Sequence, residues 1–257
     1  MKEKLRFNPY NGPKPIFSIF QWGFGGYLGP CLIIYENGLV VKAVYVNPED
    51  FFFERKIMST VISAEELNFL KNEILIQIDE NVSEAKTKYF LAPGWKDVGE
   101  VEIISNISSL KKIEIQGCDI KNETVSYHKK NKYDCGIPDK IPNYLKNCLK
   151  FLCEYKFSDL KEYVPFYFKF KLQGKKSEGE TVDWPDDLPD LESFFSYEYS
   201  NSFYFYIDGK YYKKVLEFCK INRHKNIRFR NAERELYHDP ILIFPHEDLF
   251  YYNDWYR

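Results

Sequence analysis

The sequence lacks the short motifs that assign chemistry directly to a protein. None of its six cysteines forms a C-x-x-C pair, and none of its four histidines stands in an H-E-x-x-H or H-x-E arrangement. There is also no G-x-S-x-G elbow and no G-K-[ST] phosphate loop. These absences remove the motif-based case for zinc sites, thioredoxin-type redox chemistry, serine hydrolases and P-loop nucleotide binding. We therefore predict no cofactor and no metal.

Long apolar stretches are also missing. No window approaches the roughly 18 consecutive apolar residues that a membrane-spanning helix requires. The N-terminal segment MKEKLRFNP contains no apolar core of a secretory signal. We therefore expect a cytoplasmic protein without membrane contact, whose cysteines are reduced and mostly fill the core. The cysteines are Cys31, Cys118, Cys135, Cys148, Cys153 and Cys219.

An excess of positive charge is absent as well. The net charge is −2 and the pI is about 6.2. Nucleic-acid-binding domains more often have a pI above about 9. A basic span at residues 210–234 is accompanied by no recognition motif. The sequence therefore gives no support to nucleic-acid binding.

What the sequence does contain is an abundance of aromatic side chains. Phe, Tyr and Trp make up 18% of the residues, with 22 Phe, 21 Tyr and 4 Trp. Phe and Tyr suit the pleated, half-buried surface of a sheet, so the composition favours a sheet-rich fold. Tyr and Trp are also enriched at protein interfaces, which leaves room for a binding surface.

The stretch Cys31–Val46 predicts the hairpin on which the sheet is built. Two runs rich in β-branched residues flank Asn37-Gly38, a pair that favours the positive φ angles of a tight hairpin turn. Before it, Ile16–Trp22 reads as a strand and Gly23–Pro30 as a glycine-rich turn. That turn does not match the dinucleotide fingerprint, because Leu28 occupies the sixth place and a strand follows the loop. A second hairpin is predicted from residues 101–105 and 110–116.

Three helices are predicted from apolar periodicity and end signals. Ser63-Ala-Glu-Glu66 is a capping box, in which the Ser63 hydroxyl accepts from the Glu66 amide and the Glu66 carboxylate reaches back. It predicts a helix over about 64–78, whose inner face carries Leu67, Leu70, Ile74 and Ile78. A second helix begins at Pro142, and its apolar positions are Leu145, Cys148, Leu149 and Leu152. A third follows Asp208, with Tyr212, Val215, Leu216 and Cys219 facing inward.

The remaining segments complete an α+β pattern. Pro165–Leu172 alternates as a strand with one wet face, and short strands are predicted at Ser202–Ile207, Ile227–Phe229 and Pro240–Pro245. Residues 79–100 and 117–141 are predicted as loops. We expect a twisted, mainly antiparallel sheet built on hairpins, with two to three packed helices and a smaller C-terminal strand–helix–strand unit. The main lobe spans 1–173 and the smaller lobe 174–257, packed together as one unit.

Charge is segregated near the C-terminus. Between Ser177 and Gly209 there are nine acidic residues and no Lys or Arg, whereas Lys210–Arg234 holds nine Lys or Arg against Glu217 and Glu233. One interpretation is that the two spans neutralise each other within the fold. The other is that the acidic, aromatic span binds a basic protein partner, with carboxylates steering the encounter and aromatic rings as anchors. The residues of that predicted surface are Asp183, Trp184, Asp186, Asp187, Asp190, Glu192, Tyr197, Glu198 and Tyr199.

These patterns favour a protein without catalytic activity. Our first hypothesis is a non-enzymatic cytosolic binding protein, such as an immunity protein that inhibits a toxin by covering a basic surface or active-site cleft. The alternative is a small hydrolase that uses His238, His246 and Asp248. A separate candidate nucleophile is Cys135, which is predicted to be the most exposed thiol, although no neighbour in the sequence is arranged to lower its pKa. A third hypothesis is a structural or assembly protein that buries its aromatic tail, Leu249–Arg257. The sequence assigns no oligomeric state.

Overall fold

The computed structural model describes residues 13–23, 26–45, 55–84, 86–91, 99–121, 124–129, 132–165, 167–173, 180–199, 202–222, 225–228 and 235–243. Within them the chain forms two compact units, one from Pro13 to Tyr163 and the other from Val164 onward. Each unit combines a mainly antiparallel sheet with helices, which confirms the predicted α+β class. The predicted division after residue 173 falls one strand later than the boundary between these units.

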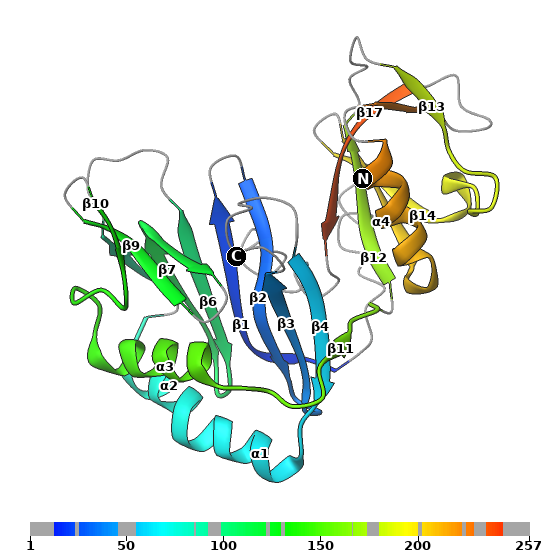
Figure 1. The fold of residues 1–257 in the computed structure, drawn as a ribbon. Coiled ribbons are helices and arrows are strands. Elements are labelled where there is room, and N and C mark those ends of the chain that lie inside the picture. Colours follow the sequence, from blue (N-terminus) through cyan, green and yellow to red (C-terminus); the bar gives the residue numbers. More distant parts are fainter. Residues whose placement is uncertain are drawn as a thin grey trace. The chain divides into compact units, whose positions relative to one another are not determined.

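The first unit is built on an eight-stranded sheet with the order β11-β4-β3-β2-β1-β6-β7-β5 (Figure 1). Neighbouring strands are antiparallel except β5 and β7, which run parallel. The strands are β1 (Pro15–Gly23), β2 (Gly26–Tyr35), β3 (Leu39–Tyr45), β4 (Arg55–Val61), β5 (Lys86–Phe90), β6 (Glu100–Asn106), β7 (Leu110–Gln116) and β11 (Lys161–Glu162).

The hairpin predicted around Asn37-Gly38 is confirmed as β2 and β3, with Ile33 opposite Val41. The Gly38 N–H donates to the Tyr35 carbonyl at 3.1 Å. Of the turn pair, Gly38 has a positive φ, of 85°, and Asn37 does not. The connection is therefore a three-residue loop that ends on a left-handed glycine, a common alternative to the two-residue turn.

The predicted turn over Gly23–Pro30 is shorter than expected. Strands β1 and β2 stay paired as far as Gly23 and Gly26, so Gly26–Pro30 belongs to a strand. Pro30 lies beside a shift in the pairing register. Such an irregularity suits a residue that has no N–H to donate to a neighbouring strand.

The helix predicted from the capping box is confirmed and extends further than expected. Helix α1 (Ala64–Phe69), the π-helical segment η2 (Leu70–Leu75) and α2 (Ile76–Asn81) follow one another without a break. As predicted, the Ser63 hydroxyl accepts from the Glu66 N–H, at 3.1 Å. The Glu66 carboxylate instead accepts a hydrogen bond from the hydroxyl of Tyr155, the residue that follows the helix at Asn143–Glu154. This bond connects the first helix to the end of the next helix along the chain.

The π-helical segment changes which side chains face the core. A π turn holds one more residue than an α turn and shifts the apolar face along the chain. Leu75 is fully buried, whereas Ile74, predicted on the inner face, is partly buried.

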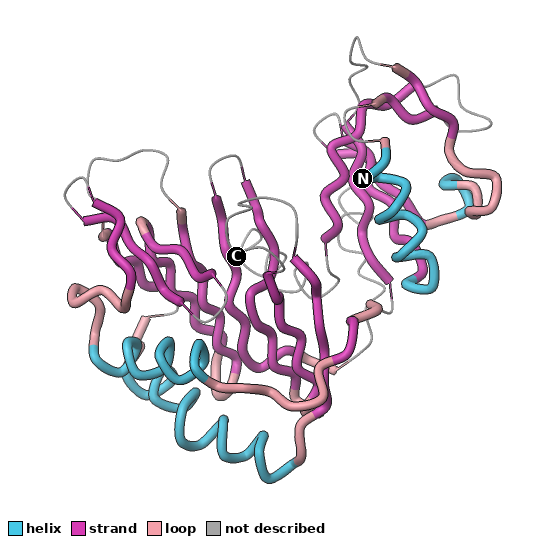
Figure 2. The backbone as a smooth tube through the Cα atoms, viewed as in Figure 1, coloured by secondary structure: helices cyan, strands magenta, loops and turns pink. Residues whose placement is uncertain are grey.

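Helices α1, α2 and α3 (Asn143–Glu154) lie on one face of the large sheet (Figure 2). Helix α3 follows Pro142, as predicted, and buries its apolar stripe. Burying one large aliphatic side chain contributes about 1.5–3 kcal/mol, so the contact between these helices and the sheet stabilises the unit. The core between sheet and helices includes Phe17, Ile34, Ile103, Ile113, Leu70, Ile78, Leu145 and Leu149.

Two segments that we predicted as loops contain strands. Residues 79–100 include β5, and residues 117–141 include β8 (Cys118–Lys121), β9 (Thr124–Lys129) and β10 (Lys132–Cys135), which form a three-stranded sheet of their own. These segments are four to six residues long, and Gly, Pro or runs of charged residues interrupt the sequence around them. Pairing with other strands decides their conformation, because β-structure depends on cross-strand contacts more than on intrinsic preference.

The second unit has a six-stranded sheet with the order β13-β16-β17-β12-β15-β14. As predicted, Phe168, Phe170 and Leu172 of β12 are buried, and the Asp208 carboxylate caps the following helical turn by accepting from the Lys210 N–H at 2.9 Å. Strand β14 was not predicted. The elements are β12 (Tyr167–Gln173), β13 (Thr181–Asp183), η3 (Leu191–Ser193), β14 (Phe195–Tyr199), β15 (Ser202–Asp208), η4 (Gly209–Tyr211), α4 (Tyr212–Ile221), β16 (Asn226–Arg228) and β17 (Glu235–Ile243).

None of the helices in the described ranges is both long and apolar enough to cross a membrane.

Candidate functional site

Trp184, predicted as an exposed anchor of the acidic surface, lies in the core of the second unit. Its side chain is 3% exposed, and its ring packs against Phe170 and Phe218 with centroid distances of 5.7 and 5.5 Å. The indole N–H donates to the Pro189 carbonyl at 2.9 Å. A buried tryptophan with its N–H bonded stabilises the fold. This burial removes Trp184 from the surface that a partner could contact.

The carboxylates of the acidic stretch form ion pairs with the basic span that follows. Asp183 lies 3.6 Å from Arg228, and Asp187 lies 2.8 Å from Lys214. Glu180 pairs in the same way with Lys225, at 3.1 Å. The hydrogen bond and charge of Lys214 lower the pKa of Asp187 below its ordinary value. The first interpretation, mutual neutralisation, is therefore observed at these residues.

The other predicted surface residues lie in the segment from the turn after β13 to the end of β14, and these two strands stand at opposite edges of the sheet. Asp186 is exposed and Asp190 is partly buried, and the Asp190 carbonyl accepts from the Ser193 hydroxyl at 2.6 Å. Glu192 belongs to η3, and Tyr197, Glu198 and Tyr199 belong to β14. The last three thus occupy a strand at the edge of the sheet.

The residues of the alternative hydrolase site fall mostly outside the described residues. His238 belongs to β17, whereas His246 and Asp248 lie beyond the described ranges. Their convergence stays a prediction, as does burial of the tail Leu249–Arg257.

Five described cysteines are buried, which agrees with their predicted place in the core; they are Cys31, Cys118, Cys148, Cys153 and Cys219. Burial raises the pKa of Cys219 to about 12 and also raises the pKa of Cys148, to which the nearby Cys153 contributes. Thiols of this kind are poor nucleophiles. Cys135 belongs to β10, and its predicted exposure is untested.

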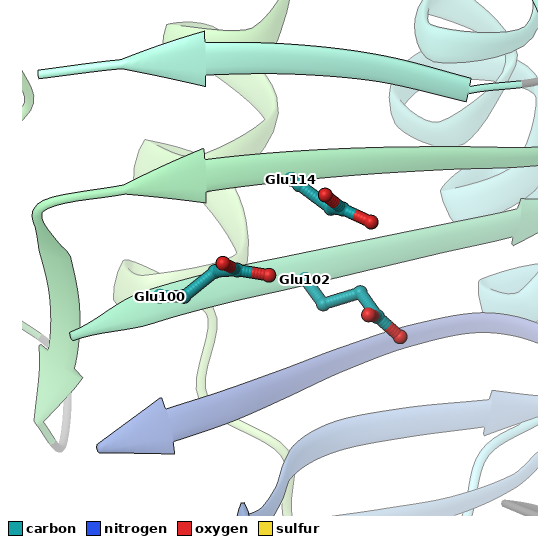
Figure 3. Close-up of side chains that lie close together, drawn as sticks. All are labelled: Glu100, Glu102 and Glu114. Atoms are coloured by element: carbon teal, nitrogen blue, oxygen red, sulfur yellow. The ribbon is translucent and has the colours of Figure 1, made fainter. Parts of the chain in front are cut away.

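A group of carboxylates that the sequence analysis did not single out lies on the large sheet of the first unit. Glu100 and Glu102 belong to β6, and Glu114 lies opposite Glu102 on β7. One carboxylate oxygen of each lies within 4.8 Å of the other two (Figure 3). Glu102 and Glu114 are buried. Carboxylate oxygens at such spacing could hold a divalent cation such as Ca²⁺ or Mg²⁺.

Three lysines already share these carboxylates. Lys112 Nζ lies 2.6 Å from a Glu102 oxygen and 3.5 Å from a Glu114 oxygen. Lys86 Nζ lies 3.0 Å from Glu114, and Lys88 also pairs with it. The two buried carboxylates, Glu102 and Glu114, are therefore already paired with ammonium groups, which a cation would have to displace. The Glu100 carboxylate accepts a hydrogen bond from the Gln116 side-chain amide at 3.3 Å. We interpret the cluster as an ionic network that joins β5, β7 and β6.

The pKa values of the two buried carboxylates are shifted in opposite directions. Burial raises the pKa of Glu102, and the hydrogen bond and charge of Lys112 offset this in part. Burial acts on Glu114 in the same direction, but hydrogen bonds from Lys88 and Lys86 and the charge of Lys112 outweigh it, so its pKa is lowered. Glu114 is thus the ionised centre of the network.

The sequence holds a signal for this cluster. Glu102 belongs to a predicted strand, and Lys112 and Glu114 are two residues apart in its predicted hairpin partner, so Lys112 and Glu114 share one face of the sheet. Glu100 comes just before the predicted strand, at the end of a segment predicted as a loop. Assigning the register of the hairpin would have placed the charges opposite one another. The contribution of β5 could not have been found in this way, because its segment was predicted as a loop.

Comparison of the chain with protein-family models, with curated proteins and with solved structures gave no match.

Proposed function

We propose that this protein is a non-enzymatic binding protein for a basic protein partner, with the binding surface on its second unit. In its most specific form it is a cytoplasmic immunity-type inhibitor, which neutralises a toxin by covering a basic cleft. The observation that carries the proposal is the run of exposed carboxylates on β13 and the turn after it. This run lies in a segment, 178–209, that contains no Lys or Arg.

The exposure of these groups supports the proposal. The side chains of Asp183 and Asp187 are 76% and 68% exposed, and Asp186 is exposed beside them. Their intramolecular partners Arg228 and Lys214 are themselves 52% and 56% exposed. Ion pairs between solvent-exposed groups contribute about 0–1 kcal/mol. A lysine or arginine of a partner can therefore replace the internal cation at little cost in free energy.

Such a surface acts mainly on the rate and specificity of association. Carboxylates that reach into solvent attract a basic surface over a Debye length of about 8 Å at physiological salt and orient it before contact. Added salt screens this attraction. Binding of the partner should thus weaken steeply as ionic strength rises.

The experiment is charge reversal at the exposed run. The full chain is used to capture its partner from the native host, and the partner is identified and purified. Its affinity is then measured at several salt concentrations for the wild type and for the variant D183K/D186K/D187K. We expect an affinity loss of about a hundredfold at low salt and a much flatter salt dependence.

A matched control makes the result specific. Glu73, Glu80 and Glu84 are exposed in the first unit, so E73K/E80K/E84K changes the net charge by the same amount at another place. The control should bind as the wild type does, apart from the small effect of net charge. Equal losses in the two variants, or wild-type affinity in the first, would refute the proposed surface.

A further inference from the structure

We infer that β14 is the docking strand of this protein: a basic partner adds an extended segment to the outer edge of β14, as one more strand of the sheet of the second unit. The inference rests on the proposed function and names how the partner is held. It concerns the backbone of Phe195–Tyr199 rather than the exposed carboxylates of β13.

The position of β14 in the sheet is the first observation. It is the last strand in the order β13-β16-β17-β12-β15-β14 and pairs residue for residue with β15, from Phe195 opposite Tyr206 to Tyr199 opposite Ser202. Within the described part of the chain it has a neighbouring strand on one side. The backbone N–H and C=O groups on the other side of such a strand can pair with an added strand.

A comparison with the other edge strands is the second observation. Natural sheets protect their edges with very short strands or with charges, lysine above all. Strand β11 has two residues, both charged, β13 has three, and β5 carries Lys86 and Lys88. Strand β14, with the sequence FSYEY, has the same length as β5 but one charged residue and no lysine. It is thus the least protected edge of the two large sheets, as expected for an edge that binds another chain.

Charge selects the occupant. The single charge of β14 is Glu198, and nine acidic residues without any Lys or Arg occupy 178–209. A second copy of this chain would bring the same negative segment to the edge, and like charges on adjacent strands are destabilising. An extended segment rich in Lys or Arg would instead find opposite charges in Glu198 and in Asp190 and Glu192 of the segment that leads into β14. The occupant is therefore a basic, extended segment of a partner protein.

The test measures backbone amides directly. The full chain undergoes hydrogen–deuterium exchange with and without a blocked heptapeptide, Lys-Val-Lys-Val-Lys-Val-Lys, or its counterpart with Glu in place of Lys. We expect exchange at 195–199 to slow about tenfold or more with the basic peptide, because new inter-strand hydrogen bonds form there. Amides of β5, an edge protected by lysines, should not change, and the acidic peptide should affect neither strand.

Two variants supply an independent measurement. S196K/E198K copies onto β14 the alternating lysines of β5, and Ser196→Thr keeps a strand-favouring residue without adding charge. We expect the first to bind the basic peptide about tenfold more weakly or worse, and the second to bind as the wild type does. If S196K/E198K fails to fold, hydrogen–deuterium exchange at 195–199 of the wild type still tests docking on β14.

The outcomes separate this inference from the proposed function. Binding of the basic peptide that depends on Asp183 and Asp187 but leaves exchange at 195–199 unchanged overturns docking on β14, while the proposed function stands. If exchange at 195–199 slows as the protein concentration rises, without any peptide, the occupant of the β14 edge is a second copy of this chain and the inference of a basic partner segment is overturned. Absence of basic-peptide binding at low salt also overturns docking on β14. The proposed function is then tested separately, by the affinity of D183K/D186K/D187K for the native partner.

Discussion

The main chains of Gly38 and Ile62 lie in direct contact where the β2–β3 hairpin meets the start of helix α1. The Ile62 N–H donates to the Gly38 carbonyl at 3.0 Å. A Cβ atom on Gly38 would lie 2.7 Å from the Ile62 carbonyl oxygen, and Gly38 has a φ of 85°. Glycine is therefore needed at this position for space as well as for backbone conformation.

Gly38→Ala should lower the free energy of unfolding by about 2–3 kcal/mol, because it adds left-handed backbone strain and displaces the Ile62 carbonyl. Urea unfolding followed by circular dichroism measures the change. Gly136→Ala is the matched control, since Gly136 has a φ of 120° but nothing within 4 Å of an added Cβ. It should cost about 1–2 kcal/mol, from strain alone. Equal costs in the two variants would show that the Ile62 contact is unimportant.

Replacement of Trp184 distinguishes a core residue from a binding anchor. Trp184→Ala should lower the free energy of unfolding by about 3–5 kcal/mol, because it leaves a large cavity against Phe170 and Phe218. Trp184→Phe retains an aromatic ring and should cost less, although it loses the hydrogen bond to Pro189. Thermal unfolding of both variants provides the measurement. Unchanged stability with loss of partner binding would contradict the burial of this ring.

The ionic network on the large sheet should appear in the pH dependence of stability. Glu114→Gln should lower the free energy of unfolding at neutral pH by about 1.5–3 kcal/mol, because charge-assisted bonds from Lys86 and Lys88 are lost. The folded pKa of Glu114 lies below the ordinary value of 4.5. Its contribution is thus fully present above about pH 4.5 and disappears as the pH falls through the lower, folded pKa. The difference between wild type and variant should shrink in acid.

Glu102→Gln should give the opposite slope and serves as the comparison for Glu114→Gln. Because burial raises the folded pKa of Glu102, the folded state takes up a proton at a higher pH than the unfolded chain does. The wild type should therefore gain stability relative to this variant as the pH falls through the folded pKa toward 4.5. Urea titrations from about pH 3 to pH 8 test both variants. Parallel pH profiles would refute the assignment of opposite shifts.

Thiol labelling tests the burial of the cysteines. Cys31, Cys118, Cys148, Cys153 and Cys219 are buried, so a short treatment of the native protein with iodoacetamide near pH 8 should leave them unmodified. The sequence predicts that Cys135 is the most exposed thiol, and its labelling tests that prediction. Peptide mass spectrometry assigns the sites, and labelling in guanidinium is the control for full reactivity. Rapid modification of Cys148 or Cys219 in the native protein would contradict the packing of helices α3 and α4.

Elements whose signals lie within a few residues could be predicted from the sequence. The Gly38 turn depends on local backbone preference, and the Ser63 cap depends on an amide three residues away. The stripe Leu145–Leu152 follows from the helical period. In each case the interacting groups are neighbours along the chain, so the pattern contains the information. The same holds for the alternation in β12 that buries Phe168 and Phe170.

The surface of the second unit could not be predicted from local sequence patterns. Composition alone identified an acidic, aromatic stretch, but it could not tell that Trp184 faces the core or that Asp187 meets Lys214. A charge pattern in the sequence does not specify whether a given side chain faces the core or the solvent. That orientation depends on which segments pack against the residue. The contact of Trp184 with Phe218 and that of Asp187 with Lys214 join residues that are far apart in the sequence.

By itself, the sequence determined the α+β class, the first hairpin, three helices and the separation of acidic from basic residues near the C-terminus. The tertiary structure decided that Lys86 and Lys88 of a predicted loop form an edge strand paired with Glu114, and that β14 ends the sheet of the second unit. Strand pairing joins distant segments, and the register of those pairs sets which charges meet. Local sequence patterns specify the elements that pair, whereas cross-strand contacts select their partners.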